Sequence, residues 1–333
     1  MSTVDNSSNE DLSIFDVDTQ QFYSTQFWVF LFLIIPSLIG CLFALYHLLL
    51  NRNLRRELHN YAMIILLIIN LFYSLTNISC FIHYFRTFET FTIIPVLRLI
   101  WGYVDWQVYV LQFLLYAWIT IERHILIFHD QLISTRKKRI FFHYFPPFII
   151  ILYCLLYYTL VYFASQCVNN FDHYSRPGFF SCAFYNTTLF LYDLIVHGIV
   201  PTFTIIISSI ALLIRVLWQK YYAHRQIQWR RYRKMTIQLL IISFLYLILP
   251  FPTIIISFLH LCGMPSYIGA EFSSRMIFVS YYTFLLFPIF TIGSLPELRA
   301  KLKKILQYHQ QRNIIRPIDF TAARTIPNRV NIQ

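Results

Sequence analysis

Long runs of apolar residues alternate with short polar segments along the chain, and the pattern occurs seven times. Each run holds about 20 residues or more, the length that a helix needs to cross a bilayer core of roughly 30 Å. The runs are Phe27–Leu50, Tyr61–His83, Leu97–Ile121, Phe141–Gln166, Leu189–Trp218, Met235–Leu261 and Met276–Ile292. The sequence therefore predicts an all-α integral membrane protein, a bundle of seven transmembrane helices.

The segments outside the runs predict how the chain is divided. The first 25 residues are polar and acidic, so we expect no regular structure there. Just after the last run, Leu298 and Leu302 share one helical face opposite Lys301 and Lys303, which predicts a short amphipathic helix lying in the membrane interface. The expected divisions are an N-terminal segment (1–25), the bundle (26–294), the interfacial helix (295–310) and a cytoplasmic tail (311–333).

Basic residues are distributed unevenly between the two sides of this predicted bundle. The formal net charge is +12, and the chain has 27 Lys and Arg residues. If the N-terminus is extracellular, all of these except Arg86, Arg98, Arg176 and Arg275 fall on the cytoplasmic side, as is usual for membrane proteins. We therefore expect a multi-pass protein of the plasma membrane with an extracellular N-terminus. Its charge indicates contact with anionic membrane lipid and not with nucleic acid.

Four of the six cysteines lie near the predicted outer face, where an oxidising compartment permits disulfides. A bridge between Cys167 and Cys182 closes the longest outer loop and is the preferred prediction, whereas a bridge between Cys80 and Cys182 is the alternative. Two sequons on the same side make Asn6 and Asn186 candidate glycosylation sites.

The third apolar run carries its polar residues on one helical face. Asp105 and Arg123 are 18 residues apart, which places them on the same face of a helix at a separation of about 27 Å. Tyr109, Gln112 and Tyr116 follow Asp105 along this face. Because charged residues inside a membrane are functional candidates, we predict that this helix links a site at one end to a site at the other.

Asp105 is the first candidate for contact with an extracellular ligand, because a carboxylate in a low-dielectric pocket attracts a cation. The alternative is a structural ion pair with Arg98 or Arg275. In the fifth run, Asp193 and His197 are four residues apart, share a helical face and could form a local pair. The predicted ligand-binding residues are Asp105, Tyr109, Trp101, Asp193, His197 and Tyr281, and the predicted ligand is a peptide or a small cationic molecule.

Prolines mark the places where the predicted helices can bend. Proline has no backbone N–H, so inside a helix it removes a hydrogen bond and produces a kink. The predicted hinges are Pro201, Pro250, Pro252 and Pro288. The sixth run contains two of them and is the natural element to pivot.

Glu122-Arg123-His124, at the inner end of the third run, is similar to the Asp/Glu-Arg-Tyr signature of rhodopsin-like (class A) G protein-coupled receptors. The prolines of the fifth, sixth and seventh runs and the interfacial helix support this resemblance. It implies that Glu122 and the sixth helix hold Arg123 at rest. It also implies that Arg123 meets a heterotrimeric G protein when the sixth helix swings outward.

The chain departs from that family's pattern at several positions within the region of resemblance, residues 26–308. Arg98 stands where the third helix usually opens with a cysteine, and Asn70 stands where the family has a sodium-binding aspartate. The helix-seven Asn-Pro-x-x-Tyr motif is replaced by Phe287–Thr291, and the usual tryptophans of the fourth and sixth helices are missing. The resemblance therefore implies a divergent receptor without the usual sodium site.

Other classes of multi-helix membrane protein fit the residues less well. A retinal photoreceptor needs a lysine in the seventh helix, and this chain has all its lysines in predicted cytoplasmic segments. A chemoreceptor channel of the insect kind has its N-terminus inside, and a transporter commonly has an internal repeat. A seven-helix channel or transporter is the alternative function. Since no histidine pair has metal-site spacing beside a glutamate, we predict no enzyme activity, no metal and no cofactor.

Overall fold

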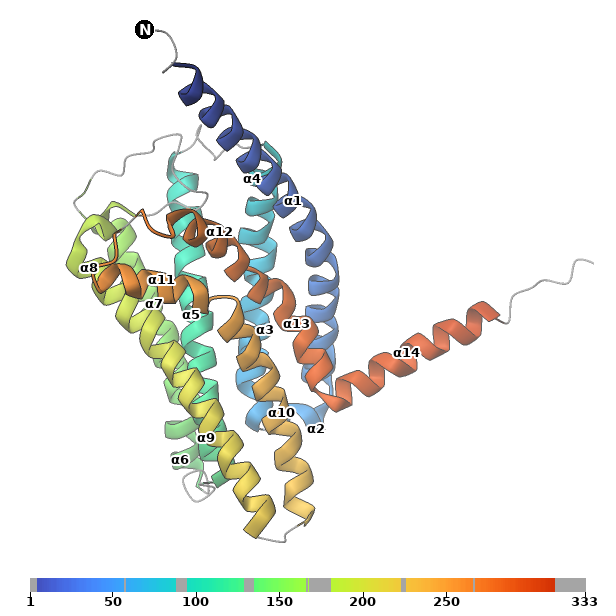
Figure 1. Cartoon of the computed structure of the whole chain (residues 1–333). Coiled ribbons are helices and arrows are strands. Elements are labelled where there is room, and N and C mark those ends of the chain that lie inside the picture. The colour runs from blue at the N-terminus through green and yellow to red at the C-terminus, as the bar shows by residue number, and fades with distance from the viewer. Residues whose placement is uncertain are drawn as a thin grey trace, which may run out of the picture.

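The structure is a computed structural model and describes residues 5–56, 58–87, 95–128, 135–165, 167, 181–222, 226–265 and 267–314. Within these residues all regular elements are helices, and the long ones run side by side in one bundle (Figure 1). The prediction of an all-α chain is confirmed for this part. In chain order the elements are α1 (Asp5–Leu50), α2 (Arg52–Arg56), α3 (Leu58–Tyr73), η1 (Ser74–Ile78), α4 (Ser79–Thr87), α5 (Pro95–Phe128), α6 (Arg136–Arg139), η3 (Ile140–Tyr144), α7 (Phe145–Phe163), η4 (Cys182–Tyr185), α8 (Thr187–Asp193), η5 (Leu194–Ile199), α9 (Val200–Tyr222), α10 (Gln226–Ile248), α11 (Phe251–Leu261), α12 (Ala270–Ser280), α13 (Tyr282–Ser294) and α14 (Pro296–Ile314).

Six stretches of helix are long and apolar enough to cross a membrane, and a seventh is counted if α10 and α11, bent by 48° at their junction, form one span. The surface agrees with this assignment, because Phe32, Leu160 and Phe244 are each more than 60% exposed. Soluble proteins rarely expose apolar side chains in such numbers on one continuous surface. The described chain therefore has the form of a multi-pass membrane protein with six or seven spans.

Helix α5 is the most enclosed of the candidate spans. In its most apolar window 67% of the residues are buried, against 17% in the span that contains α7. α5 packs against α3, α7, α9 and α10. Its polar side chains are therefore shielded from lipid by other helices, as ionisable residues within a membrane require.

Helices α1 and α13 make a close approach at Gly40. A Cβ atom added to Gly40 would lie 3.3 Å from Cδ1 of Ile292 and 3.8 Å from Cβ of Pro288. A residue without a side chain allows the two helices to approach to this separation. The first and last spans are thereby packed tightly together.

Both ends of the bundle continue further as helix than the sequence predicts. α1 has 46 residues and begins at Asp5, where no regular structure was expected. α14 continues to Ile314, four residues beyond the predicted end of the interfacial helix. Neither extension contains a glycine or proline that would stop a helix.

The first turns of α14 are attached to the bundle, and the rest of the helix projects away from it (Figure 1). Leu298 is fully buried, and Nζ of Lys301 lies 3.1 Å from Nδ1 of His47 on α1. That α14 lies in the membrane interface stays a prediction.

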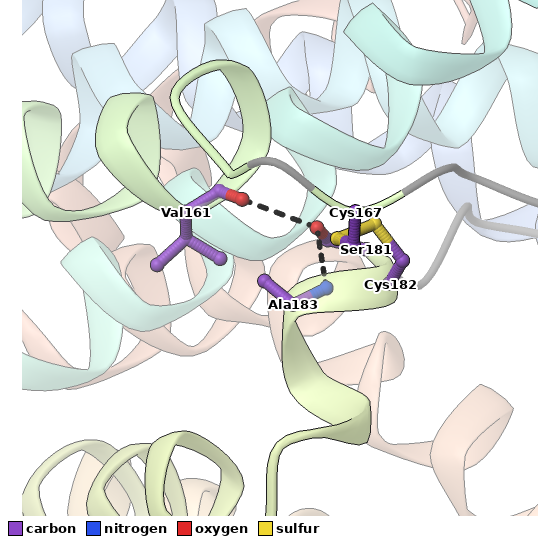
Figure 2. The surroundings of a disulfide bond; sticks show 5 residues. All are labelled: Val161, Cys167, Ser181, Cys182 and Ala183. Atoms are coloured by element: carbon purple, nitrogen blue, oxygen red, sulfur yellow. Dashed lines mark hydrogen bonds between the residues drawn. A yellow bond between two sulfur atoms is a disulfide. The ribbon is translucent and has the colours of Figure 1, made fainter.

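A disulfide joins Cys167 to Cys182, with the two Cα atoms 6.0 Å apart (Figure 2). This is the preferred of the two predicted pairings, and Cys80 is a free thiol. The bridge connects the segment after α7 to the first residue of η4.

The neighbouring Ser181 strengthens this connection. Its hydroxyl donates to the carbonyl of Val161 at 3.2 Å and accepts a hydrogen bond from the amide of Ala183 at 3.3 Å (Figure 2). The start of η4 is therefore fixed against the last turn of α7. Below, the end of the bundle that holds this disulfide is called the disulfide end, and the end that holds Arg123 is called the Arg123 end.

Candidate functional site

The carboxylate of Asp105 is the centre of a buried hydrogen-bonded cluster. Oδ1 accepts hydrogen bonds from the Tyr73 hydroxyl at 2.5 Å and from Nδ2 of Asn77 at 2.9 Å. Oδ2 accepts from the Tyr281 hydroxyl at 2.9 Å. Hydrogen bonds to an ionised acceptor are the strong ones, so this Asp105 cluster joins α3, η1 and the junction of α12 with α13 to α5.

Asp105 forms no ion pair within the part of the chain that the structure describes. Arg275, one of its two suggested partners, instead pairs with Glu271 at 2.6 Å on the surface. Arg98, the other, is 1% exposed, although the sequence predicts it near the outer surface. All three donors to Asp105 are neutral, so an ionised Asp105 leaves a net negative charge in the cluster. Such a charge attracts a cation strongly in a low-dielectric interior.

Aromatic rings pack closely around the Asp105 cluster. The ring of Tyr73 stacks on Phe284 with 3.9 Å between centroids, and Phe81 lies 4.6 Å from Tyr281 and 5.3 Å from Trp101. Tyr109 meets Tyr281 edge-on at 5.8 Å. Trp101, Tyr109 and Tyr281, all predicted ligand-binding residues, are thus gathered beside Asp105. Because Asp105 itself is only 2% exposed, the site is closed in this conformation.

Further along the same face of α5, polar side chains continue at helical spacing. Nε2 of Gln112 donates to the Tyr246 hydroxyl at 2.9 Å and lies 3.5 Å from Oδ1 of Asn70. The Tyr116 hydroxyl donates to the carbonyl of Leu239 at 2.9 Å and lies 2.9 Å from Oγ of Ser243. We call Asp105, Gln112, Tyr116 and Arg123, with their partners, the α5 polar ladder.

The α5 polar ladder contacts α10, which lies on the Arg123 side of the bend between α10 and α11. The Tyr246 ring stacks on the Tyr116 ring, with centroids 4.2 Å apart and planes within 7°. Oγ of Ser243 also lies 2.8 Å from Oγ of Ser209 on α9. α10 is therefore attached to α5 and α9 by polar contacts inside the membrane-spanning region, where an unpaired polar group is costly.

A small cavity with room for about one water molecule lies between α5, α10 and α13. Pro250 separates α10 from α11 and lines this cavity, and Pro252 follows in the first turn of α11. The 48° bend is thus at the predicted pair of hinges. The cavity is lined by Tyr109, Gln112, Phe113, Tyr246, Pro250, Thr283 and Phe284.

At the Arg123 end, the three residues of the signature lie near the last turns of α5. Glu122 and Arg123 are 1% and 2% exposed. Oε1 of Glu122 accepts a hydrogen bond from Nδ1 of His143, a residue of η3. Nε2 of His124 donates to the carbonyl of Ser208 on α9 at 2.7 Å. Glu122 and His124 therefore each contact a neighbouring segment of the bundle.

Asp193 and His197 form a separate cluster against α7. Nδ1 of His197 lies 2.7 Å from Oδ1 of Asp193, which also accepts from the Tyr158 hydroxyl at 2.9 Å. The Tyr153 hydroxyl lies 2.8 Å from Nε2 of His197 and 2.9 Å from the Tyr192 hydroxyl. The hydrogen-bond partners that the structure describes for this Asp193 cluster all lie on α7, α8 and η5. The two acids predicted to share a ligand site therefore belong to two clusters.

The remaining predicted positions have local roles. Pro201 is the second residue of α9, directly after the π-helical turn η5, and Pro288 lies inside α13, which continues to Ser294. Asn186 caps α8, because its Oδ1 accepts from the amide of Thr188 at 2.9 Å. Asn6 lies in α1, and its side chain is outside the described residues.

No protein-family model matches this sequence, and no curated protein shows significant similarity to it. The functional argument therefore depends on the residues and their geometry.

Several partners in these clusters are not among the predicted site residues. Tyr73 and Asn77 are four residues apart, so their common helical face was a signal that both point to one place. His143 stands in the aromatic stretch Phe141–Phe145 without such a signal. Its contact with Glu122 is set by how the start of the α7 span packs on α5.

Proposed function

We propose that this protein is a seven-helix membrane receptor that binds an extracellular ligand near Asp105 and activates a heterotrimeric G protein through the Arg123 end. The α5 polar ladder is the observation that supports this function most directly. Its buried polar contacts tie α5 to α3, to α10 and to the residue between α12 and α13, from Asp105 as far as Tyr116, about two helical turns before Arg123. A bundle that only had to be stable would be expected to fill this interior with apolar side chains.

The ligand end is the Asp105 cluster. A small cation or a basic group of a peptide, carrying a positive charge, would compete with Tyr73, Asn77 and Tyr281 for the carboxylate. Each donor that the ligand displaces releases one of the elements tied to α5. Binding would therefore alter the packing between α5 and the last span, and the aromatic rings nearby offer cation–π contacts to the same ligand.

The moving element in this proposal is α10. It is separated from α11 by the break at Pro250, and its polar contacts to α5 and α9 are single hydroxyl and amide hydrogen bonds beside apolar packing. Each such bond contributes about 1 kcal/mol net. A change at the disulfide end can therefore shift α10 without unfolding the bundle. Such a shift of α10 corresponds to the outward swing of the sixth helix that the family resemblance implies.

The proposal includes the orientation and the location of the chain. The Arg123 end carries the basic residues Arg52, Arg55 and Arg136–Arg139. These would face the cytoplasm and the anionic inner leaflet of the plasma membrane, with the N-terminus outside. Arg123 would then be positioned to meet the G protein when α10 moves.

The test is G-protein activation by the full chain in cells. Cells expressing the chain with an N-terminal epitope tag are screened with amines and peptides, and dissociation of Gα from Gβγ is measured by resonance energy transfer. We expect Arg123→Ala to abolish the response while surface tag density is unchanged. Arg136→Ala is the matched control, because Arg136 lies at the same end but is exposed.

Three outcomes would count against the proposal. Equal signalling by the wild type and Arg123→Ala would remove the role assigned to Arg123. A tag accessible only after permeabilisation would reverse the orientation. Ligand-gated ionic current without G-protein activation would favour the channel alternative.

A further inference from the structure

The carboxylate of Glu122 is directed toward His143, a residue outside the Glu122–His124 signature. Oε1 bonds to Nδ1 of His143, and both side chains are almost completely buried, with 1% and 0% of their surfaces exposed. An ionised carboxylate only accepts hydrogen bonds, so Nδ1 of His143 is the donor. Because successive residues of a helix point about 100° apart, Glu122 can face η3 without moving Arg123.

The local structure holds His143 in this position. It is the fourth residue of the π-helical turn η3, and single π-helical turns often occur at functional sites. The imidazole packs against two tyrosine rings, with centroid separations of 5.3 Å to Tyr61 and 4.5 Å to Tyr144. The two tyrosine rings also meet edge-on, 4.8 Å apart. The imidazole therefore has little freedom to leave Glu122.

Glu122 and His143 each use only one of their two hydrogen-bonding side-chain atoms. Oε2 of Glu122 and Nε2 of His143 are both buried and have no hydrogen-bond partner within the described chain. Such buried polar atoms are uncommon in native proteins and call for a specific explanation. Oε2 of Glu122 is already open to a new hydrogen bond, and Oε1 becomes available as well when His143 releases it, so the whole carboxylate of the residue next to Arg123 can then change its partners.

We infer that His143 is a positioning residue that sets the resting activity of the receptor, by keeping the carboxylate of Glu122 on η3 and away from Arg123. The inference rests on the proposed role of Arg123 in G-protein activation. In the resembling family the acid restrains the arginine at rest. Here His143 competes for that acid, so the resting receptor has measurable activity without ligand.

The test uses four variants of the full chain: His143→Phe, His143→Gln, Glu122→Gln and the double variant His143→Phe/Glu122→Gln. Phenylalanine retains a ring that can pack against Tyr61 and Tyr144 but cannot donate a hydrogen bond, whereas glutamine retains a donor. Ligand-independent nucleotide exchange on the G protein is measured in membranes at equal receptor density. Unfolding of the purified variants in detergent is measured in parallel.

We expect His143→Phe to lower basal exchange at least about fivefold, the lower end of typical coupling between sites. His143→Gln should remain close to the wild type. Glu122→Gln should be at least as active as the wild type, and the double variant should match Glu122→Gln, because no acid remains to restrain Arg123. Recovery in the double variant also shows that the loss in His143→Phe is not misfolding.

An unchanged or raised basal exchange in His143→Phe would overturn the inference, as would a double variant no more active than His143→Phe. If the wild type activates no G protein, the proposed function fails and the signalling role of His143 fails with it. The unfolding data distinguish a failure of the proposed function from a failure of the Glu122–His143 interaction. If the two substitutions change the free energy of unfolding non-additively, Glu122 and His143 interact and have a structural role. If their effects add, the two side chains do not interact.

Discussion

Asp105 and Asp193 are both acidic residues buried in membrane-spanning helices, but their surroundings differ in one decisive way. Asp105 accepts hydrogen bonds from Tyr73, Asn77 and Tyr281, which lie 28 to 176 residues away in the sequence. Asp193 is paired with His197 on the next turn and with Tyr158 of one neighbouring helix. The first acid connects several elements of the bundle, and the second joins α8 and η5 to α7. A buried acid by itself therefore does not show that distant elements of the bundle are connected. The positions of its hydrogen-bond partners along the chain are more informative.

Replacing each acid by alanine should show this contrast most strongly. Asp105→Ala leaves three buried donors without an acceptor, at about 1–3 kcal/mol each. We expect a loss of about 3 kcal/mol or more in the free energy of unfolding. Asp193→Ala should cost about 1–2 kcal/mol, since the Tyr158 hydroxyl lies 3.4 Å from Nδ1 of His197 and can form a replacement bond.

The measurement is reversible unfolding of the purified protein in mixed detergent and SDS. Two equal losses would show that the number of connected elements has no bearing on stability, and a larger loss for Asp193→Ala would reverse the comparison.

Isosteric amides sharpen the contrast for ligand binding. If a cationic agonist is found, Asp105→Asn should reduce its potency at least about tenfold, which corresponds to about 1.4 kcal/mol. Asp193→Asn should leave potency unchanged within about twofold, because the Asp193 cluster faces α7. Concentration–response curves for G-protein activation would decide this, and equal potency in the wild type and Asp105→Asn would reject a cationic ligand at this site.

The smallest effects concern single hydroxyl groups at the edge of each cluster. Tyr281→Phe removes one donor to Asp105 and should cost about 1–2 kcal/mol of unfolding free energy. Tyr192→Phe should cost less than about 0.5 kcal/mol, because Tyr192 is 43% exposed and lies at the end of its hydrogen-bonded chain. The same unfolding assay applies, and a larger cost for Tyr192→Phe would mean that the Asp193 cluster depends on its exposed edge.

Local periodicity explains what the sequence could predict. Asp105, Gln112, Tyr116 and Arg123 were expected on one face of one helix, and three of them form buried contacts to neighbouring helices on that face. That expectation needs only the pitch of an α-helix. The break at Pro250 and the Cys167–Cys182 bridge were likewise predictable from residue type and loop position.

The rotation of each helix about its axis is not local and was not predictable. Asp193 and His197 form the local pair that their four-residue spacing predicts, but the spacing does not say which neighbouring helix the pair faces, and η5 has π-helical turns that change which residues share a face. The partner of Glu122 depends on how η3 packs against α5, across 21 residues of chain. The early start of α1 was not predictable from its polar composition, and the same residues contain no glycine or proline that would prevent a helix.

Tyr281 is the single turn residue between α12 and α13, and it is also the residue that reaches Asp105. The last span, Ala270–Ser294, therefore has a non-helical residue at the position that bonds to the acid. Under the proposed function, a ligand that takes the place of this hydroxyl on the carboxylate would free the span at Tyr281, and we expect α12 to tilt more than α13, which packs against Gly40. Reporter groups attached to the two halves would then move by different amounts when a ligand enters.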